Sequence, residues 1–265
     1  MLCKPSTVNR SPSTVRSFTF APMEVLPTTN FQPDIILWGL RLGEPMIAFT
    51  GLLVSSVCFY AWLRLGKLQA KNDTLKLSRV FFLLTSISIV IGAIVGHLFL
   101  YALPFEFKLP GWVMGMIAVS ALEQASIVKA KVFLGEKLFK ALFYLNIIEL
   151  TLALWFISTT LWFPVVEIHS AFGFLLIVMP LEIMLWGKIR SKASLEMLLG
   201  ILLLVGAVLA HILKISLGVW FSYFDVAHLF MCASMWKFMQ GAEQWGKPDL
   251  ATVADGEALS KKVPA

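Results

Sequence analysis

Long runs of apolar residues, separated by short polar connections, dominate the chain between residues 45 and 240. A helix that crosses the hydrocarbon core of a bilayer, about 30 Å thick, needs about 20 such residues. Charged side chains gather at the ends of the runs, as in transmembrane helices. The pattern predicts an all-α integral membrane bundle of seven transmembrane helices, at residues 45–65, 80–103, 112–134, 139–162, 164–187, 195–217 and 218–240.

The sequence on either side of this region is polar. Residues 1–33 are rich in Ser, Thr, Pro and Arg and predict a disordered or transit-like tail, with Met23 as an alternative start. The transmembrane domain is expected at residues 34–245, and residues 246–265 predict a polar C-terminal tail. The mostly apolar stretch at residues 34–43 is interpreted as an interfacial helix that leads into the first span.

Composition supports a membrane location and excludes several soluble classes. Of the 265 residues, 58% are hydrophobic and 14% are charged, and the mean hydropathy is +0.80. Soluble domains are about 45–50% apolar and about 25% charged. A secreted disulfide scaffold, a coiled coil and a soluble nucleotide-binding domain are therefore excluded as the main body. The net charge of +6 comes from cations in short loops, so we expect the lipid bilayer and no nucleic acid as the partner.

The basic residues predict how the chain is oriented. They alternate between rich and poor connections, and the positive-inside rule assigns rich connections to the cytoplasmic side. The N-terminus is then outside and the C-terminus on the cytoplasmic side. The rich connections hold Arg64, Lys67, Lys71, Lys76 and Arg79 after the first span, Lys129, Lys131, Lys137 and Lys140 after the third, and Lys188, Arg190 and Lys192 after the fifth.

Ionisable and amide side chains within or beside the spans are few. Each costs roughly 2.5–3.5 kcal/mol at mid-span, so those retained usually face the protein interior or a wet cavity. All four histidines fall in the half of the membrane away from the basic connections, which favours a cavity on that side. The residues are Glu44, His97, Glu123, Gln124, Asn146, Glu149, His169, His211, Asp225 and His228.

A metal site is the sharpest hypothesis for these groups. Asp225 and His228, three positions apart, lie on one face of the last span. Imidazole and carboxylate ligands suit zinc, which in catalytic sites has three protein ligands and an open water position. His97 is the expected third ligand, with Glu44 or Glu123 as a catalytic base or as the partner that orients a ligand.

A structural interpretation of the same side chains stays open. Intramembrane histidines and carboxylates often form hydrogen bonds between helices, and we interpret Glu149, His169 and His211 in this way. Gly92 and Gly96, four positions apart, predict a close helix contact in the second span.

Several motifs resemble the CREST superfamily of membrane hydrolases. They are the Gly-Glu-Pro-x-x-x-Phe-Thr segment at residues 43–50, the pair Gly96-His97, and Asp225-x-x-His228 followed by Gly241. The superfamily includes the alkaline ceramidases, the adiponectin and progestin receptors and the lipid-remodelling enzymes of GPI-anchor maturation.

The resemblance implies a zinc ion bound by histidines of spans 2 and 7, with a Ser and an Asp nearby, and hydrolysis of a lipid amide or ester. It maps ligands onto His97 and His228. The chain departs from the pattern at two positions, because Phe224 replaces a second span-7 histidine and Ala93 replaces the serine before His97. Only Asp225 is placed to substitute as a ligand.

Three functions remain open from the sequence. The first is a CREST-like zinc hydrolase of a lipid substrate, or a relative that has lost this activity. The second is a small-molecule or ion permease, in which Glu123, Glu149 and histidines form a relay. The third is a non-catalytic membrane receptor or subunit, in which the polar residues only hold the helices together.

Overall fold

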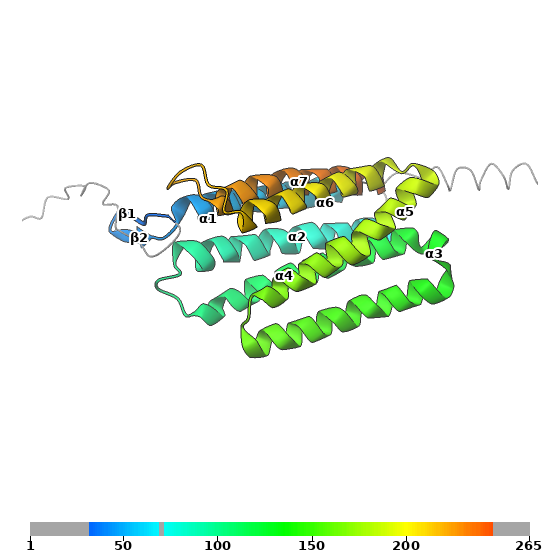
Figure 1. Cartoon of the computed structure of the whole chain (residues 1–265), viewed down its shortest axis with the longest axis horizontal. Coiled ribbons are helices and arrows are strands. Elements are labelled where there is room, and N and C mark those ends of the chain that lie inside the picture. Colours follow the sequence, from blue (N-terminus) through cyan, green and yellow to red (C-terminus); the bar gives the residue numbers. More distant parts are fainter. Residues whose placement is uncertain (1–31, 69–71, 246–265) are drawn as a thin grey trace, which may run out of the picture.

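A computed structural model describes residues 32–68 and 72–245, and most of these residues are helical. Most helices run along one common direction (Figure 1). The predicted tails lie outside the described residues, apart from residues 32 and 33. The α-helices are α1 (Pro45–Gly66), α2 (Asp73–Ala93), α3 (Leu109–Thr160), α4 (Pro164–Ala171), α5 (Met179–Ile189), α6 (Lys192–Ile212) and α7 (Tyr223–Trp245).

Shorter helical elements extend or join these helices. The π-helix η1 (Ile94–Leu98) continues α2, and the π-helix η3 (Phe172–Val178) joins α4 to α5. A 3-10 turn, η2 (Phe105–Lys108), precedes α3. Such π-helical turns are rare and are found often at functional sites.

Five helical segments among the described residues are long and apolar enough to cross a membrane, which confirms the multi-pass membrane class. Helix α7 is more polar and is not one of the five. The five segments are Pro45–Gly66, Asp73–Leu98, Phe105–Thr160, Pro164–Ile189 and Lys192–Ile212.

The longest segment contains a reversal of chain direction. At Gly135 the backbone has φ 67° and ψ 153°, a conformation essentially confined to glycine. Helix α3 therefore consists of two arms, residues 109–134 and 136–160, and Figure 1 shows the second arm folding back. These arms correspond to the predicted third and fourth spans, although the turn between them is much tighter than the sequence suggests.

The interfacial helix predicted at residues 34–43 is wrong, because this stretch forms a β-hairpin. Strands β1 (Ile35–Leu37) and β2 (Leu40–Leu42) pair antiparallel. The connecting residues Trp38 and Gly39 both have positive φ, 50° and 79°. This is the geometry of a type I′ turn, whose twist matches that of a two-residue hairpin.

The boundary between the last two spans also differs from the prediction. A loop separates α6, which ends at Ile212, from α7, which begins at Tyr223. Gly218 and Phe221 pair across this loop, so its apolar residues do not continue either helix. The sequence lacks a hydropathy signal for the break because the loop is itself rich in apolar residues.

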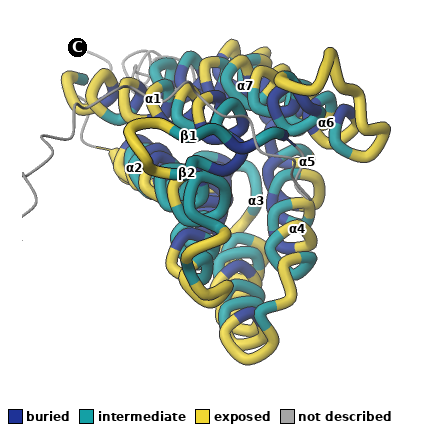
Figure 2. Tube along the Cα trace, turned by 90° about the vertical axis from the view of Figure 1, so that its left-hand side faces the viewer, coloured by how far each residue is buried: buried dark blue, intermediate teal, exposed yellow. Residues whose placement is uncertain are grey.

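The main hydrophobic core lies where α1, α2, the first arm of α3, α6 and α7 meet. Buried positions line the interior of this group, whereas the second arm of α3 is largely exposed (Figure 2). Phe238 is fully buried, with its ring centroid 6.1 Å from that of Phe81 and 5.7 Å from that of Phe174. In a bilayer, the exposed apolar arm faces lipid.

The close helix contact predicted at Gly92 and Gly96 is wrong. An added Cβ at either glycine would meet nothing within 4 Å. Close approach occurs at other glycines, such as Gly111, where a Cβ would lie 3.1 Å from Cγ2 of Ile91. The spacing of small residues alone therefore does not identify a close helix–helix contact, because the sequence does not show which helix face meets a neighbour.

One polar residue fixes two helix ends at the same place. Asn72 is the N-cap of α2, and its side-chain oxygen accepts a hydrogen bond of 2.8 Å from the backbone N–H of Leu75. Its Nδ2 donates to the carbonyl oxygen of Trp245, at 2.8 Å, in the last residue of α7. The start of α2 and the end of α7 are thus held together.

Candidate functional site

The predicted zinc ligands lie in a polar network between α1, η1 and α7, here called the α1–α7 network (Glu44, Thr50, His97, Asp225 and His228). Nδ1 of His97, in η1, lies 2.7 Å from Oε2 of Glu44. Glu44 is only 2% exposed and has a φ of 41° immediately before α1. Glu44 thus lies beside His97, and its role as a partner that orients a metal ligand stays a prediction.

Asp225 is fully buried, and both of its carboxylate oxygens accept hydrogen bonds. Oδ2 accepts from Nε2 of Gln32 at 2.6 Å and from both the backbone N–H and the hydroxyl of Ser222 at 2.7 Å. Oδ1 accepts from the hydroxyl of Thr50 at 2.9 Å. Because Ser222 immediately precedes α7, the carboxylate accepts the backbone N–H at the start of that helix, which is the half of a capping box that the acidic residue supplies.

His228 is oriented by the same network. Its Nδ1 lies 2.9 Å from Oγ1 of Thr50, whose hydroxyl can donate to Asp225. With the hydroxyl proton directed to the carboxylate, Nδ1–H of His228 donates to Oγ1, and Nε2 is the unprotonated nitrogen. His97 has the same relation to Glu44. Metal-binding histidines commonly have such an acceptor on the second nitrogen.

Zinc bound by all three predicted ligands does not fit this arrangement. Among the described residues, His97, Asp225 and His228 do not bring three ligand atoms within 4.8 Å of one another. Four donors already occupy the oxygens of Asp225, and Phe224, where the resemblance expects histidine, has its ring centroid 6.0 Å from that of His97. Zinc ligation here stays a prediction from the sequence.

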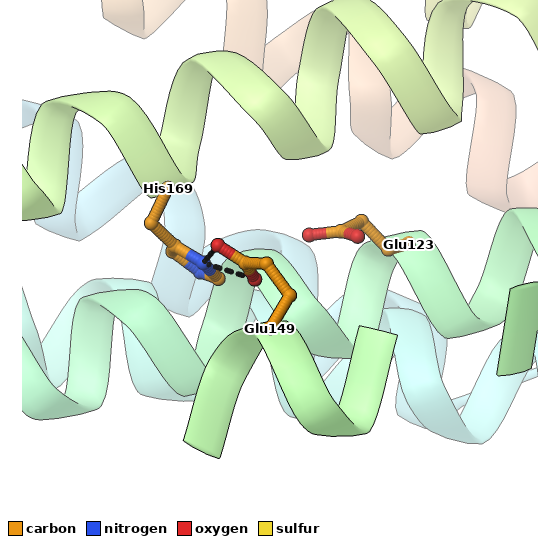
Figure 3. Close-up of side chains that lie close together, drawn as sticks. All are labelled: Glu123, Glu149 and His169. Carbon is orange, nitrogen blue, oxygen red and sulfur yellow. Dashed lines mark hydrogen bonds and ion pairs between the residues drawn. The ribbon is translucent and has the colours of Figure 1, made fainter. Parts of the chain in front are cut away.

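A second set of ionisable side chains lies between α3 and α4 and is called here the α3–α4 cluster (Glu123, Glu149 and His169); Glu123 and His169 are buried and Glu149 is half-buried. One possible ligand atom from each residue lies within 4.8 Å of the other two. Glu123 belongs to the first arm of α3, Glu149 to its second arm and His169 to α4. Figure 3 shows the carboxylate of Glu123 pointing toward the other two side chains.

Each ring nitrogen of His169 lies within hydrogen-bond distance of an oxygen atom. Nε2 lies 3.0 Å from the carbonyl oxygen of Met116, which can only accept, so Nε2 carries a proton. Nδ1 lies 2.7 Å and 2.9 Å from the two carboxylate oxygens of Glu149. The imidazole is therefore fixed by a backbone carbonyl on one side and faces the carboxylates with the other.

Glu123 is fully buried, but only one of its two carboxylate oxygens has a hydrogen-bond partner. Its Oε2 accepts a hydrogen bond of 2.9 Å from Nδ2 of Asn146, whereas Oε1 has no hydrogen-bond partner. Space beside Oε1 exists because residue 173, in η3, is glycine. A Cβ at Gly173 would clash with Oε1 and lie 2.8 Å from Cγ1 of Val119. Buried polar atoms without partners are rare and often mark function.

The structure thus places Glu123 away from the predicted zinc ligands and in the set that the permease hypothesis grouped as a relay. It lies with Glu149 and His169, which we interpreted as structural, and not with His97 and Asp225. No local spacing signals this cluster, since its members come from three helical segments. The buried role of Asp225 did have a signal, the Ser222-x-x-Asp225 pattern of a capping box.

These features define the chain as a multi-pass helical integral membrane protein with two buried polar centres. A model of a family of unknown function, DUF6962, matches residues 46–247, and the chain belongs to this family. Searches of curated proteins and of solved structures each find no match. The family match does not connect the chain to the CREST superfamily, so that resemblance stays a prediction.

Proposed function

We propose that seven segments of the chain cross the membrane, with the N-terminus outside and the C-terminus on the cytoplasmic side. The two arms of α3, residues 109–134 and 136–160, supply two crossings, and α7 supplies the seventh. At about 1.5 Å per residue each is long enough to span the hydrocarbon core. The reversal at Gly135 adjoins Lys137 and Lys140, which supports placing this turn on the cytoplasmic side.

We further propose that the protein is a cation permease. The observation that supports this proposal is a line of buried polar side chains along the first arm of α3. Between Met116 and Ser126, a rise of about 15 Å, this arm contacts polar groups of three other segments. The contacting residues are His169, Asn146 and Glu182.

The line contains acidic groups at successive levels. Ser126 donates to Oε1 of the fully buried Glu182 at 2.9 Å, about one helical turn beyond Glu123. Ser120 donates at 2.9 Å to Asn146, which in turn donates to Glu123. Ionisable side chains that face a bundle interior commonly mark ion pathways, and carboxylates favour cations. A purely structural role does not explain why Oε1 of Glu123 has no partner.

Cation flux into proteoliposomes tests the permease. We expect the purified protein to accelerate entry of at least one cation among K⁺, Mg²⁺, Mn²⁺ and Zn²⁺, measured with trapped fluorescent indicators, over protein-free liposomes. Glu123→Gln removes the charge with little change in volume, and should slow this flux by about 10-fold or more, since a buried charge contact is worth at least about 1.4 kcal/mol.

Glu167→Gln is the matched control. Glu167 is an exposed glutamate in α4, two residues before His169, and its substitution should leave the flux unchanged. Equal flux in wild type and protein-free liposomes for every cation, or equal flux in wild type and Glu123→Gln, would contradict the proposal. If substitutions at the buried polar residues then only lower the thermal stability, the remaining hypothesis is a non-catalytic membrane receptor or subunit.

The α1–α7 network supports a second candidate, a zinc-dependent hydrolase of lipid amides or esters. The supporting observation is that Glu44 and the Thr50–Asp225 pair orient two imidazoles by their Nδ1 atoms. A zinc ion held by His97 and His228 would still need a third ligand from a source other than Asp225.

The zinc content of the purified protein distinguishes the hydrolase from the permease. For a hydrolase, we expect near-stoichiometric zinc in the purified protein by elemental analysis, lost in His97→Ala and His228→Ala but kept in the exposed Glu167→Gln. Release of fatty acid from lipid amides or esters should disappear in the same two variants. Wild-type protein without zinc would remove the hydrolase.

A further inference from the structure

The α3–α4 cluster has the composition of a metal site, and we infer that Glu123, Glu149 and His169 bind a divalent transition-metal cation such as Mn²⁺, Fe²⁺, Co²⁺ or Zn²⁺. This inference rests on the proposed permease function, because the bound ion is taken to be the transported one. It concerns a site distinct from the histidines of the α1–α7 network. Without a further observation, the three side chains would be only an ion pair between His169 and Glu149 with Glu123 as an acidic neighbour.

The unpartnered carboxylate oxygen points to a ligand. Glu123 has no exposed surface, its Oε1 lacks a hydrogen-bond partner, and its carboxylate is directed at the other two side chains (Figure 3). An ionised carboxylate with an unpaired oxygen is costly in a medium of low dielectric constant. A bound cation removes that cost by supplying the missing electrostatic partner.

The state of His169 also suits a metal. Its Nε2–H is fixed on the carbonyl oxygen of Met116, which leaves Nδ1 toward Glu149 and Glu123. Metal-binding histidines usually donate their other N–H to a backbone carbonyl or carboxylate in this way. The same bond holds the imidazole plane when an ion exchanges, so only the carboxylates need to adjust.

The distances require little rearrangement. Ligand atoms of one tetrahedral or octahedral ion, about 2.1 Å from the metal, lie about 3.0–3.4 Å apart. Nδ1 of His169 lies 2.7–2.9 Å from the oxygens of Glu149, and an atom of Glu123 completes a set within 4.8 Å. Rotation of the Glu123 side chain, whose Oε1 has no competing bond, brings the third ligand into range.

Charge and ligand type select the class of ion. Metal binding displaces the proton that lies between Nδ1 of His169 and the carboxylate of Glu149. The two carboxylates and the resulting neutral imidazole then balance a charge of +2, so the occupied cluster is neutral in the bilayer interior. A nitrogen ligand disfavours Ca²⁺ and Mg²⁺, which prefer oxygen, and favours first-row transition metals. Three protein ligands leave positions for water, which suits an ion that must enter and leave.

The experiment uses the full-length protein in detergent, with Mn²⁺ alone as the probe, followed by electron paramagnetic resonance. We expect one Mn²⁺ per chain at saturation and, in pulsed spectra, modulation from an imidazole nitrogen. That modulation should disappear in His169→Ala. Glu123→Gln and His169→Ala should weaken binding about 100-fold or more, since even outer-shell changes cost about 10–100-fold.

Two further variants keep the test independent of ligand removal and of misfolding. Gly173→Ala keeps all three ligands but fills the space beside Oε1 of Glu123, and should also weaken binding. Glu167→Gln, exposed on α4, should bind Mn²⁺ as the wild type does. The thermal unfolding temperature of each variant, measured in the same detergent without Mn²⁺, identifies variants that fold.

The outcomes separate the inference from the permease proposal. Absence of stoichiometric Mn²⁺, unchanged affinity in folded Glu123→Gln and Gly173→Ala, or nitrogen modulation lost in His97→Ala instead of His169→Ala overturns the inference. If another cation still crosses the membrane in a Glu123-dependent way, the permease stands and the inference fails. Mn²⁺ binding at the cluster without flux of any cation supports the site and overturns the permease.

Discussion

Replacement of Asp225 with alanine is expected to lower the free energy of unfolding by about 3–5 kcal/mol, because it removes several buried hydrogen bonds to a charged acceptor, each worth about 1.5–3 kcal/mol before the neighbours adjust. The substitution removes the acceptor of four hydrogen bonds in a fully buried place, including those from the backbone N–H and the hydroxyl of Ser222. It also removes the cap of α7. The protein should unfold at lower denaturant concentration in detergent, as followed by tryptophan fluorescence.

Two further variants test whether the lower free energy of unfolding comes from the lost hydrogen bonds of Asp225. Asp225→Asn keeps one acceptor oxygen and the shape of the side chain, so its loss should be smaller than that of Asp225→Ala. Asp73→Ala removes an aspartate that is exposed at the start of α2, and should cost about 1 kcal/mol or less. If Asp225→Ala were no more destabilising than Asp73→Ala, Asp225 would not organise the α1–α7 network.

The second large effect is expected for Gly200→Ala, at about 1–3 kcal/mol of destabilisation, as for overpacked cores. The new Cβ would overlap ring atoms of Phe238 and lie 3.3 Å from its Cγ. Phe238 cannot easily move, because Phe81 and Phe174 pack against its ring. The displacement also strains the hydrogen bond of 2.8 Å from Ser234 to the carbonyl of Gly200.

Gly187 offers the matched control for this change. It lies in α5, and an added Cβ there would meet nothing within 4 Å. Since alanine is the better helix former, Gly187→Ala should be neutral or slightly stabilising. Equal midpoints of thermal unfolding for Gly200→Ala and wild type would mean that α6 and α7 are not packed as closely as described.

Hydropathy alone predicts most of the helical architecture, because the bilayer imposes both the length of an apolar run and the helical backbone. The predicted span at 45–65 corresponds closely to α1 (Pro45–Gly66). The predictions of secondary structure are wrong where apolar residues form a hairpin or a loop instead of a helix. The stretch at 34–43 forms a hairpin, because Trp38-Gly39 adopts a type I′ turn.

The polar centres were harder to predict, because they depend on which helices become neighbours. The sequence singles out the ionisable residues of the spans, and two of them, Glu44 and His97, lie 2.7 Å apart. It does not reveal that Asp225 is saturated by donors from other parts of the chain, including Gln32, which was assigned to the tail. Nor does it reveal that Glu123 lies close to Glu149 and His169, because the position of Glu149 depends on the reversal at Gly135.

The bond between Asn72 and Trp245 has a consequence for how the bundle can move. By joining the start of α2 to the end of α7, it ties together a block in which α7 contacts α1, α2 and α6, and α1 contacts α2. Alternating access in a transporter requires one part to rock against another. For the proposed permease, the rocking part would be the second arm of α3 with α4 and α5, and the block would serve as the static scaffold.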